Sequence, residues 1–295
     1  QRYLLPDYQS DIASGHRVAA SIYMEASMGY DPGDTDPLAS AAEIDFALEA
    51  RDRGNGIVCN GIVSYVNLRQ GGNVRSVLKK HVERGRGALR GIRDTLAWSE
   101  YPELRNHRIN PSVGDLSSDT FRAGAVAVGE AGLALDLWIY QDQLAELADV
   151  VRDVPGTRFV LDHCGGPLMC GPYACEPAQR FAAWKEAVAR ISDAGNVHVK
   201  IGGLGMRTLG FNFHQRLEPP SSEDLEQAWA PYVGSCLRYF GPERCMFESN
   251  FPVDKEIASY KTIWNAFKRL SAHLREDERR LLFAGTARAV YQVQG

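Results

Sequence analysis

The sequence lacks the features that mark membrane, nucleic-acid-binding and disulfide-stabilised proteins. No apolar run approaches the roughly 18 residues of a membrane span, and the N-terminus shows no signal-peptide pattern. A net charge of −4 gives no electrostatic reason to bind nucleic acid or an anionic membrane. The six cysteines are scattered, without a zinc-binding spacing, in a chain too large to need disulfides. We therefore expect a cytoplasmic protein with neither a nucleic-acid nor a membrane partner.

Linkers and phosphate-binding loops are also missing. No Gly/Ser-rich or low-complexity stretch divides the chain, so we expect residues 1–295 to form one domain. The first strand-like run is followed by Met24-Glu25-Ala26-Ser27, which contains no G-x-G-x-x-G. A dinucleotide site at an open sheet is therefore not indicated.

Short apolar runs alternate with amphipathic segments along the whole chain. The runs typical of buried parallel strands are Val18–Met24, Ile57–Ser64, Leu89–Ile92, Ala134–Ile139, Arg158–His163, Val197–Ile201 and Cys245–Ser249. Helical spacing occurs over Leu5–Ser14, Leu38–Arg53, Asn73–Arg84, Gln143–Val154, Arg180–Asp193 and Glu223–Tyr239. This alternation predicts an α/β protein, and a closed barrel needs eight strands. We expect a (β/α)8 TIM barrel whose first strand is missing from this chain.

Charged, amide and aromatic residues lie at or near the ends of these runs, where TIM barrels carry their active sites. They are Glu25, Arg90, Arg93, Trp98, Trp138, Tyr140, Gln141, His163, Lys200, Glu248 and Asn250. His163 precedes Gly-Gly-Pro, a sharp turn that would leave its imidazole at the strand edge. Lys200 lies in an apolar strand, where a charge is costly unless it meets an acid or a ligand. A core histidine and a snorkelling lysine are the structural alternatives.

The last strand places Met246, Glu248 and Asn250 on one face. An inward Glu248 is a candidate general base because burial raises a carboxyl pKa, and a structural ion pair is the alternative. Arg90 and Arg93 are three residues apart, so we expect them to face different ways. Arg93, nearer the barrel mouth, is the candidate that grips a substrate carboxylate.

At these positions the sequence resembles the amidohydrolase-related family of lactonases, which includes 2-pyrone-4,6-dicarboxylate lactonase and sugar-acid lactonases. The likeness runs from Tyr3 to Tyr291. Its landmarks are the segments 90–93 (RGIR), 162–167 (DHCGGP), 199–203 (VKIGG), 247–252 (FESNFP) and 282–288 (LFAGTAR). Their order and spacing imply an amidohydrolase barrel.

Two departures from the family pattern bear on metal binding. The family begins with a strand ending in H-x-H, and no such pair occurs here; its last strand reads G-S-D-W-P, where this chain has Asn250 in place of the aspartate. An amide cannot take a proton from water at neutral pH. Only His163 of the family's ligands remains, with Tyr140 and Gln141 where another would stand. The resemblance with these losses predicts no catalytic metal and no cofactor.

We therefore expect a metal-independent hydrolase, lactonase-like, that acts on a small carboxylated lactone or ester. Glu248 would deprotonate water oriented by Asn250, and His163 with Lys200 would polarise the carbonyl. The expected substrate contacts are Arg93, Arg90, Glu25, Trp98, Trp138, Tyr140 and Gln141. An amidohydrolase-type decarboxylase and a small-molecule-binding barrel that has lost catalysis are the alternatives. Whether the protein forms a homo-oligomer is left open.

Overall fold

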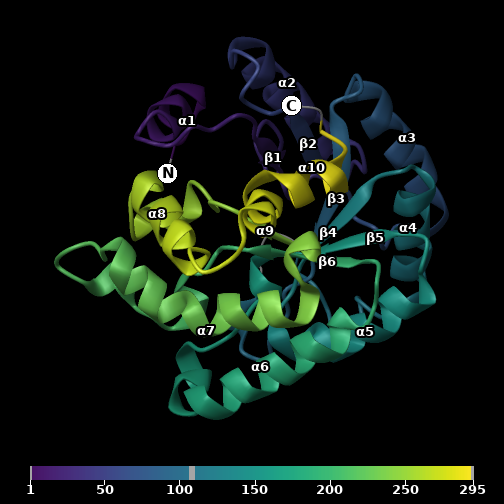
Figure 1. Ribbon diagram of the computed structural model, residues 1–295. Coiled ribbons are helices and arrows are strands. Elements are labelled where there is room, and N and C mark those ends of the chain that lie inside the picture. Colours follow the sequence, from purple (N-terminus) through teal and green to yellow (C-terminus); the bar gives the residue numbers. More distant parts are fainter. Residues whose placement is uncertain (1, 106–109, 294–295) are drawn as a thin grey trace.

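A curled parallel sheet surrounded by helices forms the computed structural model, which describes residues 2–105 and 110–293 (Figure 1). The strands are β1 Ile22–Met24, β2 Gly61–Tyr65, β3 Leu89–Thr95, β4 Ala134–Trp138, β5 Arg158–Leu161, β6 Val197–Ile201 and β7 Cys245–Phe247. They pair in chain order, every pair parallel. The predicted TIM-type architecture is confirmed, although β1 and β2 begin several residues later than expected.

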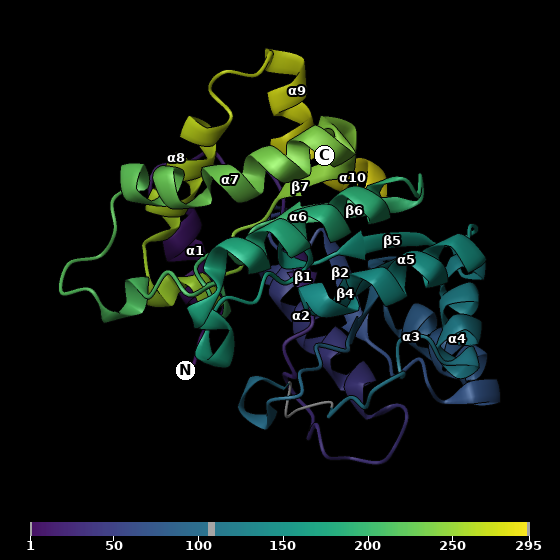
Figure 2. The same ribbon diagram turned by 90° about the horizontal axis from the view of Figure 1, so that it is seen from below.

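Helices surround the strands, except that the C-terminal helix packs against the barrel interior (Figures 1 and 2). They are α1 Leu5–Ile12, α2 Ala42–Arg53, α3 Val74–Arg84, α4 Asp119–Glu130, α5 Leu144–Asp153, α6 Pro177–Ser192, α7 Ser222–Phe240, α8 Tyr260–Leu270, α9 Glu276–Arg280 and α10 Thr286–Tyr291. Helix α8 was not predicted from helical spacing, and neither was helix α4. Gly124 there packs so closely that a Cβ would lie 2.5 Å from the Leu68 carbonyl oxygen. Within the described ranges no helix is long and apolar enough to cross a membrane.

Side chains alternate between two apolar cores across the sheet. One face packs against the surrounding helices through residues such as Ile62, Leu135 and Val199. The other face points into the barrel, where Val63, Ala134, Val160 and Met246 form a separate cluster with Val290, Tyr291 and Val293. The C-terminal segment therefore fills part of the barrel interior. Met246 faces inward as the alternation of the last strand predicted.

Strands β1 and β7 are the edges of the sheet. Among residues 2–105 and 110–293, no strand joins them, which matches the expectation of seven strands. The last described residues instead bind the barrel from inside: Arg158 Nη1 donates to the Val290 carbonyl oxygen at 2.6 Å. Burial of Val290 and Tyr291 thus contributes to closing this side of the fold.

Arg90 does not lie at the end of its strand as the sequence predicted, and a β-bulge occurs at this residue. Ile62 pairs with Leu89 and Val63 pairs with Gly91, so Arg90 is the extra residue. Arg90 lies one residue into β3, where its Cγ and Val293 both approach Gly61. The strand runs on to Thr95, so Arg90 stands at its beginning rather than its end. Its predicted role in substrate binding is therefore corrected, because active-site groups of such barrels lie at the other end of the strands.

Tyr291 gives a testable measure of how the C-terminal segment stabilises the barrel. Its hydroxyl donates to Asp136 Oδ1 at 2.5 Å, and both side chains are buried. Tyr291→Phe removes this bond to a charged acceptor, which should lower the free energy of unfolding by about 1–3 kcal/mol. Urea denaturation measures the loss, with Tyr239→Phe on the outer helix α7 as the control. A Tyr291→Phe variant as stable as wild type would contradict this role.

Candidate active site

A buried ion network occupies the barrel interior above Tyr291. We define it as Glu25, Arg93, Asp136, Asp162 and Lys200. Lys200 Nζ lies 2.5 Å from Asp136 Oδ1 and 2.9 Å from Asp162 Oδ1, and the lysine is only 4% exposed. Burial opposes charge on Lys200, but the two carboxylates outweigh it and raise the lysine pKa. The Lys200 ammonium is thus already bound by two acids, and its predicted carbonyl-polarising role stays a prediction.

Arg93 belongs to the same network. Its Nε lies 2.9 Å from Glu25 Oε1, and one Nη donates to the Glu25 carbonyl oxygen at 2.8 Å. The other Nη is 3.6 Å from Asp162 Oδ2. Every guanidinium nitrogen therefore faces an oxygen of the protein. Arg93 is placed to hold Glu25 and Asp162, and the substrate contacts predicted for Arg93 and for the buried Glu25 stay predictions.

Desolvation decides how the acids of this network titrate. Burial raises the pKa of Asp136 to about 6, against the lowering effect of Lys200. Burial also works to raise the pKa of Asp162, but the charges of Lys200 and Arg93 outweigh it and the pKa falls below its usual value. Asp162 is thus the ionised partner of both cations at neutral pH. It immediately precedes His163, which ties the network to the next group of residues.

His163 and Glu248 form a second pair. His163 Nδ1 lies 2.5 Å from Glu248 Oε1, and the Glu248 side chain is 15% exposed. Burial works to lower the pKa of His163, but the charge of Glu248 and their hydrogen bond raise it above its ordinary value. The Nε2 atom is the remaining nitrogen for exchange of a proton. The sequence predicted both residues, but not that they contact each other.

Two glycines after β6 make room for this pair. A Cβ on Gly202 would lie 2.1 Å from Glu248 Cγ, and one on Gly203 would lie 2.6 Å from the His163 ring. Both distances are too short for any side chain. The imidazole also leaves β5 on left-handed backbone, with φ of 52° at His163. The Gly-Gly sequence therefore positions the pair by leaving space for it.

Asn250 and Asp254 complete the strand-end site, which we define as His163, Glu248, Asn250 and Asp254. Asn250 Nδ2 donates to Asp254 Oδ1 at 3.0 Å, and Asp254 is 2% exposed. Burial raises the pKa of Asp254 to about 7, while the bond from Asn250 and the charge of His163 oppose the rise. Sequence reasoning missed Asp254 because it lies four residues beyond the strand-end motif, in the 3-10 helix Val253–Glu256.

Aromatic residues flank His163 on one side. The Trp138 ring lies 4.6 Å from the imidazole in an edge-to-face arrangement, and Tyr140 packs on Trp138 at 5.5 Å. The Tyr140 hydroxyl donates to the Leu104 carbonyl oxygen at 2.6 Å. These contacts support Trp138 as a wall of the site and give Tyr140 a structural bond. Trp98, whose ring lies 5.4 Å below the Arg105 guanidinium, stays a prediction as a substrate contact.

Gln141 has a structural role. Its Oε1 accepts from the Leu168 backbone N–H at 2.9 Å, and its Nε2 donates to the Arg180 carbonyl oxygen at 3.1 Å. Gln141 is 4% exposed. The two polar atoms thus hold the loop after β5 and helix α6, and the predicted contact of Gln141 with substrate stays a prediction.

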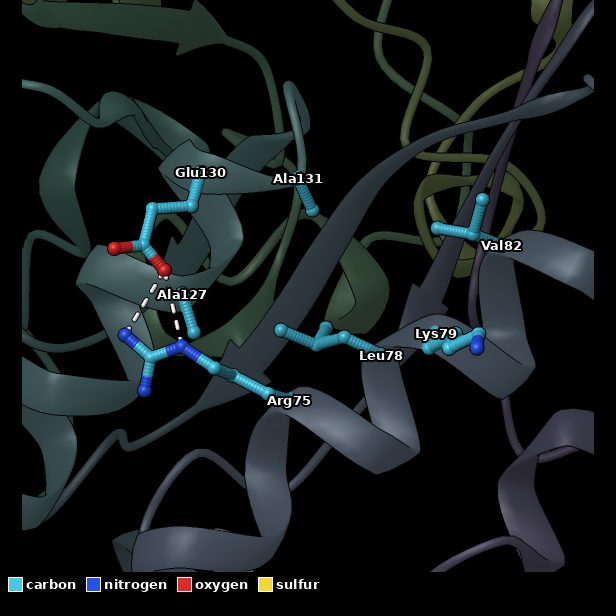
Figure 3. Close-up of a pocket in the computed structure, with 7 residues that line it drawn as sticks. All are labelled: Arg75, Leu78, Lys79, Val82, Ala127, Glu130 and Ala131. Atoms are coloured by element: carbon cyan, nitrogen blue, oxygen red, sulfur yellow. Dashed lines mark hydrogen bonds and ion pairs between the residues drawn. The ribbon is translucent and has the colours of Figure 1, made fainter.

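A surface hollow of about 310 Å³ lies elsewhere, between α3 and α4 (Figure 3). Leu78, Val82 and Ala127 line it, and an ion pair between Arg75 and Glu130 crosses one side. It is on the helical outside of the barrel and contains none of the strand-end residues. We therefore assign no part of the chemistry to this hollow.

The donor set does not fit a catalytic metal. Throughout residues 2–105 and 110–293, no three His, Cys, Asp or Glu side chains are grouped so as to hold an ion. A catalytic zinc needs about three protein ligands. Glu248 already occupies His163 Nδ1, and Asp162 is bound by Lys200 and Arg93. Metal independence stays a prediction.

Glu248→Gln tests the electrostatic coupling within the pair. Removing the negative charge next to Nδ1 should lower the pKa of His163, because that charge and its hydrogen bond raise it. Proton NMR of the imidazole Cε1–H against pH measures the change, with His163→Ala to assign the signal. The exposed His273 is an internal reference that should not move. An unchanged His163 titration would show that the two side chains do not interact.

Comparisons with known proteins agree with this fold. A family model described as amidohydrolase matches residues 36–293. An uncharacterized protein, y4mH of Sinorhizobium fredii, is 31% identical over 99% of this chain and 86% of its own length. An L-fucono-1,5-lactonase of Burkholderia multivorans is 25% identical over 98% of this chain and 86% of that protein.

A solved structure shows the same fold. The crystal structure of an amidohydrolase from Burkholderia multivorans with bound zinc superposes with a TM-score of 0.76, covering 100% of this chain and 90% of that one at 22% identity. At this identity the likeness supports the fold, and the zinc is a property of that protein. The extent of the family match carries the assignment: this chain belongs to the amidohydrolase family.

Proposed function

We propose that the protein is a metal-independent hydrolase of a small lactone or related ester. The observation that carries the proposal is the His163–Glu248 pair, 2.5 Å apart at the C-terminal ends of the strands and beside Trp138. An imidazole oriented by a carboxylate through one nitrogen is a general base through the other. The lactonase name of a relative over nearly the whole chain supports the same reaction class.

In this mechanism His163 takes the proton from water and Glu248 stabilises the imidazolium. Glu248 binds Nδ1, so Nε2 accepts the proton while water attacks the ester carbonyl carbon. The protonated imidazole then returns the proton to the leaving alkoxide as the ring opens. Glu248 thus acts through His163 instead of contacting water itself, which revises the roles expected from sequence. Because His163 must be neutral, turnover should rise as pH increases through its raised pKa.

The ion network bears on the charge of the substrate. Arg93 and Lys200 already bind Glu25, Asp136 and Asp162. A substrate carboxylate would have to compete with these buried acids for either cation. We therefore favour an uncharged, hydroxylated lactone over the carboxylated lactone suggested by sequence. Hydroxyl groups suit a site with the acceptors Glu248 and Asn250, and the partner we propose is this small molecule alone.

Removing either member of the pair should abolish most lactone hydrolysis. We expect His163→Ala and Glu248→Gln to lower kcat by about 10²–10⁴-fold, the usual contribution of general-base catalysis. Glu243→Gln, at the opposite end of β7, is the matched control and should retain wild-type turnover. Ring opening is followed by acid release at constant pH. Full activity of both site variants would contradict the proposed mechanism.

A substrate panel tests the reaction class. Uncharged five- and six-membered sugar lactones should be hydrolysed with higher kcat/KM than lactones that carry carboxylates. Carbon dioxide release from hydroxybenzoates without lactone hydrolysis would favour the decarboxylase alternative instead. Tight binding of a panel member without turnover would favour a binding barrel. Each outcome is read from the same purified protein by carbon dioxide detection, acid release and calorimetry.

A further inference from the structure

Asp254 links the loops that follow β6 and β7. Its Oδ1 accepts from Asn250 Nδ2 at 3.0 Å, and its Oδ2 lies 3.4 Å from the Gly205 backbone N–H. A backbone hydrogen bond also joins Asp254 to Asn250: the Asp254 N–H donates to the Asn250 carbonyl oxygen at 3.0 Å. A Cβ on Gly205 would lie 3.0 Å from Asp254 Cγ, so this glycine allows the close approach. The carboxylate is thus held from two loops at once.

The contact fixes which way the Asn250 amide faces. Nδ2 is directed to Asp254, so Oδ1 points the other way within the amide plane and is left as an acceptor. Asn250 is on left-handed backbone with φ of 49°, which further restricts the side chain. An acceptor can bind the proton of a water molecule or of a substrate hydroxyl. It cannot stabilise an oxyanion, which needs a donor.

We propose that Asp254 is a positioning residue that holds Asn250 Oδ1 as an acceptor for the nucleophilic water or a substrate hydroxyl. The proposal rests on the proposed hydrolase function for its kinetic consequences. Its physical basis is the 3.0 Å bond between two side chains of the strand-end site, one of them 2% exposed. Asp254 itself needs no contact with substrate. The role goes beyond filling space, because a neutral residue of similar size without an acceptor would leave the amide free to rotate.

A double-mutant cycle separates positioning from a general structural effect. Asp254→Ala and Asn250→Ala should each lower kcat by about ten-fold, the effect of one hydrogen bond, and the double variant should lose no more than either alone. Asp254→Asn keeps an acceptor oxygen and should retain most of the turnover. Glu256→Ala, in the same 3-10 helix but exposed and paired with Arg207, is the control and should behave as wild type. Multiplying losses in the double variant would overturn the proposal.

A second measurement is independent of activity. The Asn250 side-chain amide protons, assigned with Asn250→Ala in a ¹⁵N-resolved NMR spectrum, should exchange slowly with water in the wild type and in Asp254→Asn. They should exchange fast in folded Asp254→Ala, and unchanged protection there would overturn the proposal. If wild type hydrolyses no lactone, the proposed function fails while this readout still decides the role of Asp254. If the alanine variant does not fold, fast exchange of these protons in Asp254→Asn would overturn the proposal.

Discussion

Charge buried inside this barrel is stable only when it is paired, and this requirement arranges the interior of the protein. Lys200 and Arg93 lie among Glu25, Asp136 and Asp162, with Tyr291 adding a further bond to Asp136. Breaking such a pair leaves an uncompensated charge and typically costs about 3–5 kcal/mol. These residues are therefore committed to one another. The proposed chemistry lies instead at the strand-end site, where His163 and Glu248 form the pair that would act on the substrate.

The strand-end site depends on space as much as on charge. Gly202 and Gly203 leave room for Glu248 and for the His163 ring, and Gly205 allows the approach of Asp254. A methyl group at Gly202 or Gly203 would displace a side chain of the strand-end site, and one at Gly205 would first meet Ile257, at 2.6 Å. The loop after β6 thus contributes shape, while the loops after β5 and β7 contribute the reacting and positioning groups. Because Glu248 contacts His163 Nδ1, the proposed base is the His163 imidazole and not the Glu248 carboxylate alone.

The sequence predicts the fold well because apolar runs and helical spacing are patterns of neighbouring residues. Such patterns show which side chains of a strand or helix will be buried. It also brings His163 and Glu248 to the same end of the barrel, since parallel strands share that end. It fails where a residue's role depends on what lies across the barrel. Arg93 and Lys200 look like ligand-binding cations until their acidic partners on other strands are known. A one-residue bulge moves Arg90, and Asp254 belongs to the site only because the chain turns back after Asn250.

The central claim is that side chains alone perform the hydrolysis, and metal content measured alongside turnover tests it most directly. Wild-type protein would be dialysed against a chelator, its bound metals quantified by plasma mass spectrometry, and its lactone hydrolysis measured before and after zinc is added. The account predicts the same kcat in protein with far less than one metal ion per chain, and no gain on adding zinc. Turnover that disappears with the metal and returns in proportion to bound zinc would contradict it.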